Sequence, residues 1–377
     1  MHIRQVFSYH YNVMVNITKE VSMTQSNYSP RDYNTFIGID VDKASFSFTV
    51  RDYGMMKRQR KIPSNPDDFY HYIQKVLDGR KVVCAYEAGP TGFHLYDYLK
   101  GLGIPCYITS ASSIPKAANE KVKTNRIDSG KIAEYLMSGE FKPIRVPSGP
   151  YRELRHLVKV RERYVHERKV TKQRIKALLL YTNLHIALQD VDSNWSRNHI
   201  QELSCLECSF AIRHRLDMLL EDLTYAREKT ASVHKTIRAF CREHSEINEY
   251  MQYLQSIPGI GFIVAVTILG RLGDPSLLRS PREIGAFLGL TSSERSTGGM
   301  IHKGPITHLG NKMLRSLLVE AAWVAIRKDK QLNQFYYRIR NKHHVFYASN
   351  IAITAVARKL THIIYRVLKD RRHYIHY

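Results

Sequence analysis

Apolar positions in the first third of the chain follow strand-like and helix-like patterns in turn. From Phe36 onward, apolar residues alternate with polar ones or run uninterrupted over short stretches bounded by turn residues. These stretches predict strands over Phe36–Asp40, Ser45–Val50, Lys57–Ile62, Lys81–Glu87 and 105–110. Apolar residues at helical spacing predict helices over Asp67–Leu77, Phe93–Leu102 and Ile127–Met137.

The predicted elements follow the order β-β-β-α-β-α-β-α. Three strands joined by short connections favour a meander, and the later strands alternate with helices that cover the faces of a sheet. This is the element order of the RNase H-like (RuvC-like) fold, an α/β fold with a mixed sheet, which we assign to residues 35–145. Residues 1–34 are rich in Tyr, Asn, Ser and charged side chains, and we expect them to form a flexible extension.

Prolines and glycines between 143 and 150 mark a boundary, after which the chain becomes helical. Residues 151–247 are expected to form an all-α helical hairpin or coiled coil. A third block, residues 250–370, is expected to be mostly helical and to end in two helices, Lys312–Arg327 and Ile351–Leu368.

The first helix of the hairpin is strongly basic. It is predicted over Tyr151–Leu180, where ten Lys and Arg stand against three Glu. Most charged helices simply present a solvated face, but this excess is too large for salt bridges along the surface. We therefore expect Arg161, Arg168 and Lys172 to contact nucleic acid.

Composition supports a polyanionic partner for the whole chain. The chain has 57 Lys and Arg against 34 Asp and Glu, a net charge of +23, which favours binding to nucleic acid or to an anionic membrane. The longest apolar run, Phe262–Leu272, is shorter than the roughly 20 residues that a bilayer requires, so no membrane association is expected. Five cysteines, an odd number, do not make a disulfide framework and fit a cytoplasmic location.

Carboxylates stand at two predicted strand ends and at one helix start. Asp40 and Glu87 close apolar strands, and Asp128 opens a helix. In an RNase H-like sheet the first and fourth strands are neighbours, so Asp40 and Glu87 are expected to face each other. Carboxylate oxygens at such a position suit Mg²⁺, which acts in phosphoryl transfer. The alternative is a set of ordinary acids paired with local Arg or Lys.

A glycine-rich turn, Ser256–Gly261, precedes an apolar helix. Backbone N–H groups at Gly259 and Gly261 would allow close approach to a phosphate, as in helix-hairpin-helix modules on DNA. A tight turn between helices without a ligand fits the same residues equally well.

A second glycine-rich segment, residues 292–311, places Ser296 and Thr297 before Gly298-Gly299. A hydroxyl in a flexible loop amid cations is what nucleophilic attack on a phosphodiester needs. A polar loop that caps a helix is the alternative, and composition alone favours it. The cations of this segment and of the helix that follows are His302, Lys303, Lys312 and Arg315.

Five sequence blocks together resemble one family. They read GIDVDK, YEAGPTGFHLYDYL, KVKTNRIDSGKIAEYL, LQSIPGIGFIVAVTILGRLGD and FLGLTSSERSTGGMIHKGPITHLGNKMLRSLLVEAAW. In this order they resemble the insertion-sequence transposases of the IS110 and IS1111 type, which have an N-terminal DEDD RuvC-like domain and a C-terminal transposase domain. The resemblance covers residues 36–368.

The resemblance implies roles for single residues. Asp40, Glu87 and Asp128 take three of the four metal-binding positions, and Asn125 takes the remaining one. Asparagine is uncharged there, so Asp42 or Glu134 would have to compensate. The nucleophilic serine of the family falls on Ser296 or Thr297, and Ser296 is favoured because it keeps a serine at the site.

The resemblance further implies the partners of the reaction. They are double-stranded DNA at the element ends and target, a structured guide RNA encoded by the element, and further copies of the chain in a dimer or tetramer. The implied function is DNA recombination that mobilises an insertion sequence. Two alternatives stay open: a metal-dependent RuvC-like junction nuclease, which would not need Ser296 or Thr297, and a noncatalytic nucleic-acid-binding protein, which would not need Asp40.

Overall fold

The computed structural model describes residues 28–54, 57–110, 125–184, 195–297, 300–307 and 309–375, with the backbone alone at 125–127, 295–297 and 300–303. The chain divides into two compact units, Met1–Val146 and Pro147–Tyr377. Within the described residues, no helix is both long enough and apolar enough to cross a membrane.

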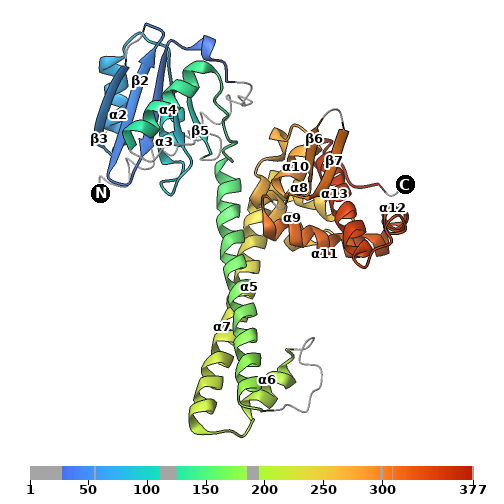
Figure 1. Ribbon diagram of the computed structural model, residues 1–377. Coiled ribbons are helices and arrows are strands. Elements are labelled where there is room, and N and C mark those ends of the chain that lie inside the picture. The colour runs from blue at the N-terminus through green and yellow to red at the C-terminus, as the bar shows by residue number, and fades with distance from the viewer. Residues whose placement is uncertain are drawn as a thin grey trace. The chain divides into compact units, whose positions relative to one another are not determined.

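The first unit contains a five-stranded mixed sheet with the order β3-β2-β1-β4-β5 (Figure 1). Strand β1 is antiparallel to β2 and parallel to β4, and β4 is parallel to β5. The predicted α/β architecture and the pairing of the first and fourth strands are therefore confirmed. The elements are η1 (Pro30–Asp32), β1 (Thr35–Val41), β2 (Ser45–Asp52), β3 (Lys57–Pro63), α2 (Pro66–Val76), β4 (Val82–Glu87), α3 (His94–Gly101), β5 (Cys106–Thr109) and α4 (Asn125–Ser138).

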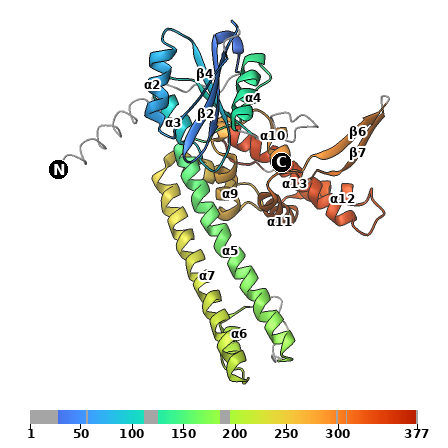
Figure 2. The ribbon, with the colours of Figure 1, turned by 60° about the vertical axis from the view of Figure 1, so that its left-hand side comes forward.

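Alternation along β1 and β4 produces a three-layer arrangement. Ile37 belongs to a core with Phe69 of α2 and Leu99 of α3, whereas Phe36 belongs to a separate core with Ile132 of α4. Figure 2 shows the same layers, with α2 and α3 on one face of the sheet and α4 on the other. Both faces of β1 are buried, which explains its nearly continuous apolar sequence.

A glycine allows α4 to approach β1 directly. A Cβ atom at Gly38 would lie 2.1 Å from the carbonyl oxygen of Ser129 and 2.4 Å from the backbone nitrogen of Ala133. Beside this contact, the hydroxyls of Thr49 and Ser129 are hydrogen-bonded at 3.0 Å. The start of α4 is thus fixed over β1 and β2.

The last residues of the expected N-terminal extension pack onto the first unit. The Tyr28 ring lies 5.3 Å from that of Tyr107 and 6.0 Å from that of Phe141, between ring centroids. Its hydroxyl donates a hydrogen bond to the backbone oxygen of Leu136. Residues 28–34 are therefore part of the folded unit, because their aromatic side chains cover apolar surface beside α4.

The second unit combines a long antiparallel helical hairpin, α5 and α7, with a mostly helical C-terminal part (Figures 1 and 2). Tyr151 and Leu154 of α5 and Ile237 of α7 are buried in the same core as α8, α9, α11 and α13, so the hairpin and the C-terminal part share one core. The elements are α5 (Gly149–Tyr181), α6 (Arg197–Ser204), α7 (Phe210–Glu243), α8 (Ser245–Gln255), α9 (Phe262–Leu272), η3 (Pro275–Leu277), α10 (Pro281–Phe287), β6 (Ser292–Thr297), β7 (Met300–Ile306), α11 (Lys312–Lys328), α12 (Lys330–Arg340) and α13 (Ala348–Lys369).

The glycine-rich segment after α10 is largely a β-hairpin, whereas the sequence favoured a flexible loop. Strands β6 and β7 are antiparallel, and Thr297 pairs with Met300. In the sequence, Gly298-Gly299 stands between the two strands, and Gly-Gly is a common pair at two-residue hairpin connections.

The contact at Gly38 gives a test of the fold. Gly38→Ala should lower the free energy of unfolding of the first unit by about 1–3 kcal/mol, because the new methyl group overpacks the α4 backbone. Native-state hydrogen exchange of the β1 and β4 amides measures this change. Gly101→Ala is the control, since a Cβ at Gly101 meets no atom within 4 Å. Equal exchange in the two variants would contradict the close approach.

Candidate catalytic and nucleic-acid-binding sites

Two of the predicted carboxylates lie at the ends of neighbouring parallel strands. Ile39 of β1 pairs with Tyr86 of β4, so Asp40 and Glu87 are the next residues along the two strands. Successive strand residues alternate between faces. Since Phe36 of β1 and Val83 of β4 belong to the core beneath α4, Asp40 and Glu87 are on the same face as α4.

The third carboxylate, Asp128, is in the first turn of α4 and is half-buried, as are Asp40 and Glu87. The residue after it, Ser129, contacts Gly38, only two residues before Asp40. The packing of α4 on β1 therefore brings all three acids to one end of the sheet. The positive end of the helix dipole also favours an acid in this first turn.

These acids have the donor chemistry of an open metal site. Among the described residues, no three His, Cys, Asp or Glu side chains lie close enough together to hold a metal ion. Mg²⁺ commonly keeps several waters and is held by one or two carboxylates together with substrate phosphates. The arrangement fits such a site, completed by water and phosphate, and does not fit a closed structural metal centre.

The side chain of Asn125 lies outside the described residues, although α4 begins at this position. Glu134, one of the two residues expected to compensate for it, pairs with Arg51 at 3.5 Å. Arg51 is opposite Phe36, at the other end of β1 from Asp40. We call Asp40, Glu87 and Asp128 together the carboxylate edge. Glu134 therefore does not belong to it. Asp42 follows β1 and accepts a hydrogen bond from the backbone N–H of Lys43 at 2.7 Å.

The two candidate nucleophiles, Ser296 and Thr297, are the last two residues of β6. The backbone places Ser296 opposite Ile301 and Thr297 opposite Met300. The side chains of both, and of His302 and Lys303 on β7, lie outside the described residues.

Two further cations predicted near this hairpin differ in their surroundings. Lys312 is exposed at the start of α11. The Arg315 guanidinium donates a hydrogen bond to the backbone oxygen of Leu288 at 2.7 Å, so this arginine holds the segment between α10 and β6.

The three cations predicted on α5 occupy the seam of the helical hairpin. The seam positions are spaced alternately by four and three residues, as in a coiled coil. Its ends are apolar and fully buried, and its middle carries three half-buried cations next to the buried Tyr164 and Thr171. The seam residues are Leu154, Val158, Arg161, Val165, Arg168, Lys172, Ile175 and Leu179.

Residues of α7 add to this positive charge. Arg161 Nε donates a hydrogen bond to Nε2 of His234 at 2.8 Å, so this nitrogen of the imidazole is unprotonated. Burial, followed by repulsion from Arg168, lowers the pKa of Arg161 and also that of Arg227. Burial, followed by repulsion from Arg168, Arg227 and Lys176, likewise lowers the pKa of Lys172.

The nearest acids of α5 are occupied elsewhere. Glu162 pairs with Arg271 of α9, and Glu167 pairs with Arg163 at 3.2 Å. We call the cations Arg161, Arg168, Lys172, Arg227 and Arg238, with His234, the seam cluster. In the part of the chain that the structure describes, none of these side chains forms an ion pair.

The Ser256–Gly261 turn has a packing role. Gly259 has a φ of +85°, and a Cβ there would lie 2.1 Å from the backbone oxygen of Ala321 in α11. Gly261 precedes α9 and has open space around its Cα. The turn lines a surface pocket, and Lys328 of α11 lines the same pocket. Gly259 is thus explained by packing, whereas Gly261 and Lys328 are accessible to a phosphate.

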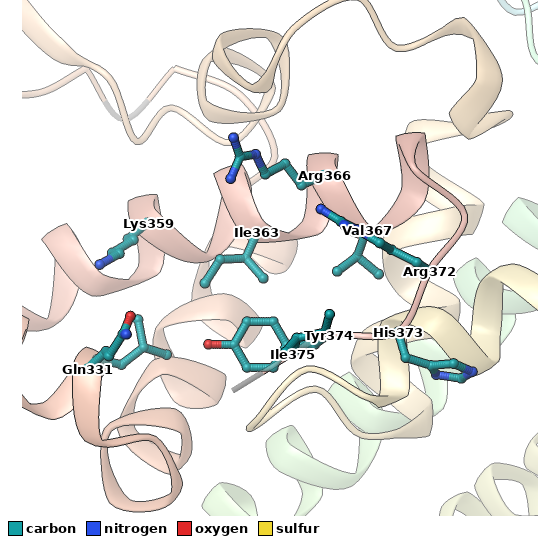
Figure 3. Close-up of a pocket in the computed structure, with 10 residues that line it drawn as sticks. Gln331, Lys359, Ile363, Arg366, Val367, Arg372, His373, Tyr374 and Ile375 are labelled. Carbon is teal, nitrogen blue, oxygen red and sulfur yellow. The ribbon is translucent and has the colours of Figure 1, made fainter. Parts of the chain in front are cut away.

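A second pocket, of about 170 Å³, lies between α12, α13 and the C-terminal tail (Figure 3). Tyr374 fixes the tail, since its hydroxyl donates to Asp329 Oδ2 and its N–H donates to Ser256 Oγ, both at 2.8 Å. Apolar side chains such as Ile363 form one wall. No acid lines the pocket, and its cations are Lys359, Arg366 and Arg372.

Comparison with known proteins assigns this combination of units. Residues 37–183 match a DEDD transposase family of the IS110 type, and residues 251–337 match the transposase IS116/IS110/IS902 family. The chain belongs to the IS110/IS116/IS902 transposase family. A DEDD domain implies a divalent metal ion, and a transposase is an enzyme that cuts and rejoins DNA.

Some relatives of this transposase match nearly the whole chain, and others match only part of it. It is 27% identical to the putative transposase y4qE of Sinorhizobium fredii over 90% of each chain. It is 25% identical to the transposase for insertion sequence element IS1111A of Coxiella burnetii over 78% of each chain. It is also 31% identical to the pilin gene-inverting protein of Moraxella bovis over 34% of this chain and 39% of that protein.

Sequence reasoning missed several cationic residues of the transposase. Arg227, His234 and Arg238 join the seam cluster from the second helix of the hairpin, for which no nucleic-acid contacts were predicted. The sequence contains a signal for such a cluster. Arg161, Arg168 and Lys172 follow the same four-three spacing as the apolar seam residues, which places them on the face toward the second helix. The pocket of Figure 3 depends on the folded position of the tail, which local sequence does not indicate.

His234 makes the stability of the free transposase depend on pH. Burial, followed by repulsion from Arg161, Arg238 and Arg168, lowers the pKa of His234 from its ordinary value of 6.5. Below about pH 6.5 the unfolded chain therefore binds more protons at His234 than the folded protein does. Stability is lost as the pH falls from about 6.5 through the lowered pKa.

His234→Gln removes this titration and keeps an acceptor for Arg161. Thermal unfolding at pH 7.5 and 5.5 should show a larger fall in Tm for the wild type than for the variant. Parallel falls in Tm would show that protonation of His234 is not opposed by the cluster.

Proposed function

We propose that the transposase moves an insertion sequence by cutting and rejoining DNA through a serine nucleophile. The C-terminal glycine-rich segment of the matched family supports this role for Ser296. Attack of its Oγ on a phosphodiester would form a Ser–O–P bond and release the sugar oxygen, which takes up a proton. The reverse attack would rejoin a strand without an external energy source, because the phosphoester bond is conserved.

The backbone of β6 offers a reason to treat Ser296 and Thr297 as distinct. They occupy successive strand positions, and successive positions belong to opposite faces. A scissile phosphate approaching one face would meet only one of the two positions. We assign the nucleophile to Ser296.

The carboxylate edge is proposed to hold the divalent ion. One or two of the acids Asp40, Glu87 and Asp128 would bind it together with water and phosphate, with Asn125 contributing a neutral oxygen. A Mg²⁺ ion held there would neutralise developing charge on the phosphate. The acids keep fixed positions relative to one another, because β1, β4 and α4 hold their backbones in place. The proposed reaction needs residues from both units.

The seam cluster is proposed to bind the phosphate backbone of DNA or of an element-encoded guide RNA. The observation that carries this proposal is the gathering of five Lys and Arg in one hairpin without ion-pair partners among the described residues. Phosphate contact would relieve their repulsion. With a guide RNA, base pairing would supply sequence selectivity, and cations need only hold the backbone. Further contributions are expected from Gly261, His302, Lys303 and Lys312. We expect the active form to be a homodimer or homotetramer.

Ser296→Ala should abolish a covalent protein–DNA adduct while leaving DNA affinity unchanged, since it removes only the attacking hydroxyl. The adduct is measured on denaturing gels with end-labelled DNA of the insertion-sequence end. Thr297→Ala is the matched control and should retain the adduct. Asp40→Asn should also lose it, which distinguishes a recombinase from a noncatalytic binding protein.

The opposite pattern has a defined meaning. An adduct that survives Ser296→Ala and disappears in Thr297→Ala would transfer the role to Thr297. Metal-dependent cleavage without any adduct in the wild type would favour the RuvC-like nuclease, in which water is the nucleophile.

Arg168→Gln should weaken nucleic-acid binding and stabilise the free protein. The variant removes one phosphate contact, so the slope of log K against log salt should decrease by about 0.9 for duplex DNA. It also removes repulsion toward Arg161 and Lys172, so Tm should rise. Binding isotherms at several salt concentrations and thermal unfolding measure the two effects.

Lys169→Gln is the control, because Lys169 is adjacent and exposed but outside the seam. An unchanged salt slope together with a lower Tm in Arg168→Gln would assign Arg168 to the fold instead.

A further inference from the structure

The turn between α12 and α13 exposes three consecutive apolar or aromatic side chains. Phe346 is fully exposed, with a relative accessibility of 105%, and Tyr347 and Val345 are 57% and 42% exposed. All residues from 341 to 347 are exposed. Isolated exposed apolar side chains are common on protein surfaces, whereas three in succession at one turn form a patch that calls for a partner.

The turn holds Phe346 in a defined place. The N–H of Ala348 donates to the backbone oxygen of Val345 at 3.0 Å, which closes a four-residue turn with Phe346 at its second position. Ala348 itself is buried at the start of α13. Phe346 is therefore presented to solvent by an anchored turn and contributes almost no buried surface to folding.

The sequence on both sides of this turn carries cations and no acid. No Asp or Glu occurs between residues 330 and 369. Arg340 and Lys342 are exposed beside the turn and form no ion pair within the described part of the chain. The Lys and Arg of this stretch are Lys330, Arg338, Arg340, Lys342, Arg358, Lys359, Arg366 and Lys369.

The same two helices carry the acid-free pocket of Figure 3. Charge complementarity thus selects a polyanion along the α12–α13 hairpin. Pairing with the same hairpin of a second copy is disfavoured, because it would bring another acid-free hairpin against the first. The aromatic tip selects a polyanion with an exposed flat apolar face, and an unpaired nucleic-acid base has one.

We propose that Phe346 stacks on an unpaired base of the DNA substrate while Arg340 and Lys342 contact the flanking phosphates. The proposal rests on the DNA-binding function proposed above and extends it to a structure-selective contact. Strand exchange requires base pairs to open, and each freed base loses stacking partners. An aromatic side chain replaces that stacking without regard to base identity.

The test compares two DNA probes, a fully paired duplex and the same duplex with a short internal bubble that contains a fluorescent base analogue. Phe346→Ala should reduce affinity for the bubble probe about tenfold and leave affinity for the paired duplex unchanged. It should also abolish the change in analogue fluorescence on binding. Phe346→Trp should restore both, since tryptophan stacks as well.

Phe210→Ala is the matched control, because Phe210 is 89% exposed at the start of α7. It should bind both probes like the wild type. Tm should be unchanged in both alanine variants, because neither side chain is buried.

Five outcomes would overturn the proposal. Equal affinity of the wild type for both probes, or an unchanged bubble preference in Phe346→Ala, removes the stacking contact while the DNA-binding function stands. A change in oligomeric state of Phe346→Ala by sedimentation would reassign the tip to self-association, and Phe346-dependent binding to anionic vesicles would reassign it to lipid. Failure of the wild type to bind either probe would reject the proposed DNA-binding function as well.

Discussion

Positive charge without ion-pair partners among the described residues is the constraint on which the second unit depends. The α5–α7 hairpin tolerates the seam cluster because both ends of the seam are apolar and buried, from Leu154 and Val158 at one end to Ile175 and Leu179 at the other. Burial of each such side chain contributes about 1.5–3 kcal/mol, whereas a pair of partly exposed charges interacts by roughly 0.2–1 kcal/mol. Packing at the ends therefore outweighs repulsion in the middle, and the hairpin holds a charge excess that a polyanion would neutralise.

In the first unit, the positions of the candidate metal-binding acids depend on the close packing of α4 on β1. Gly38 lets the backbone of α4 rest on β1, and the hydrogen bond between Thr49 and Ser129 fixes the register of that contact. Asp128 is adjacent in sequence to Ser129, so its position follows from the same contact. Half-buried carboxylates at one end of a sheet are oxygen donors that can hold a hard cation together with water and phosphate.

The sheet and the edge carboxylates could be predicted from sequence because both depend on short-range alternation. Once the element order indicated that β1 and β4 are neighbours, the adjacent positions of Asp40 and Glu87 at the strand ends followed. The β6–β7 hairpin was not predicted, because its strands are polar and lack an apolar alternation; only Gly298-Gly299 marked it. The packing role of Gly259 and the hydrogen bond from Arg315 to Leu288 depend on residues distant in sequence. No local pattern contains that information.

The two helical hairpins of the second unit differ in what they offer a nucleic acid. Cations alone bind phosphates of any sequence or structure, and this contact positions a substrate without distinguishing paired from unpaired strands. The α5–α7 hairpin offers half-buried cations of this kind along its seam. The α12–α13 hairpin adds the exposed ring of Phe346, whose contact with a base face is possible only where a base has left the duplex stack. A recombinase must hold intact DNA before the reaction and opened DNA during it. One cationic surface along a helical seam and another beside the exposed ring of Phe346 would separate these two tasks within a single chain.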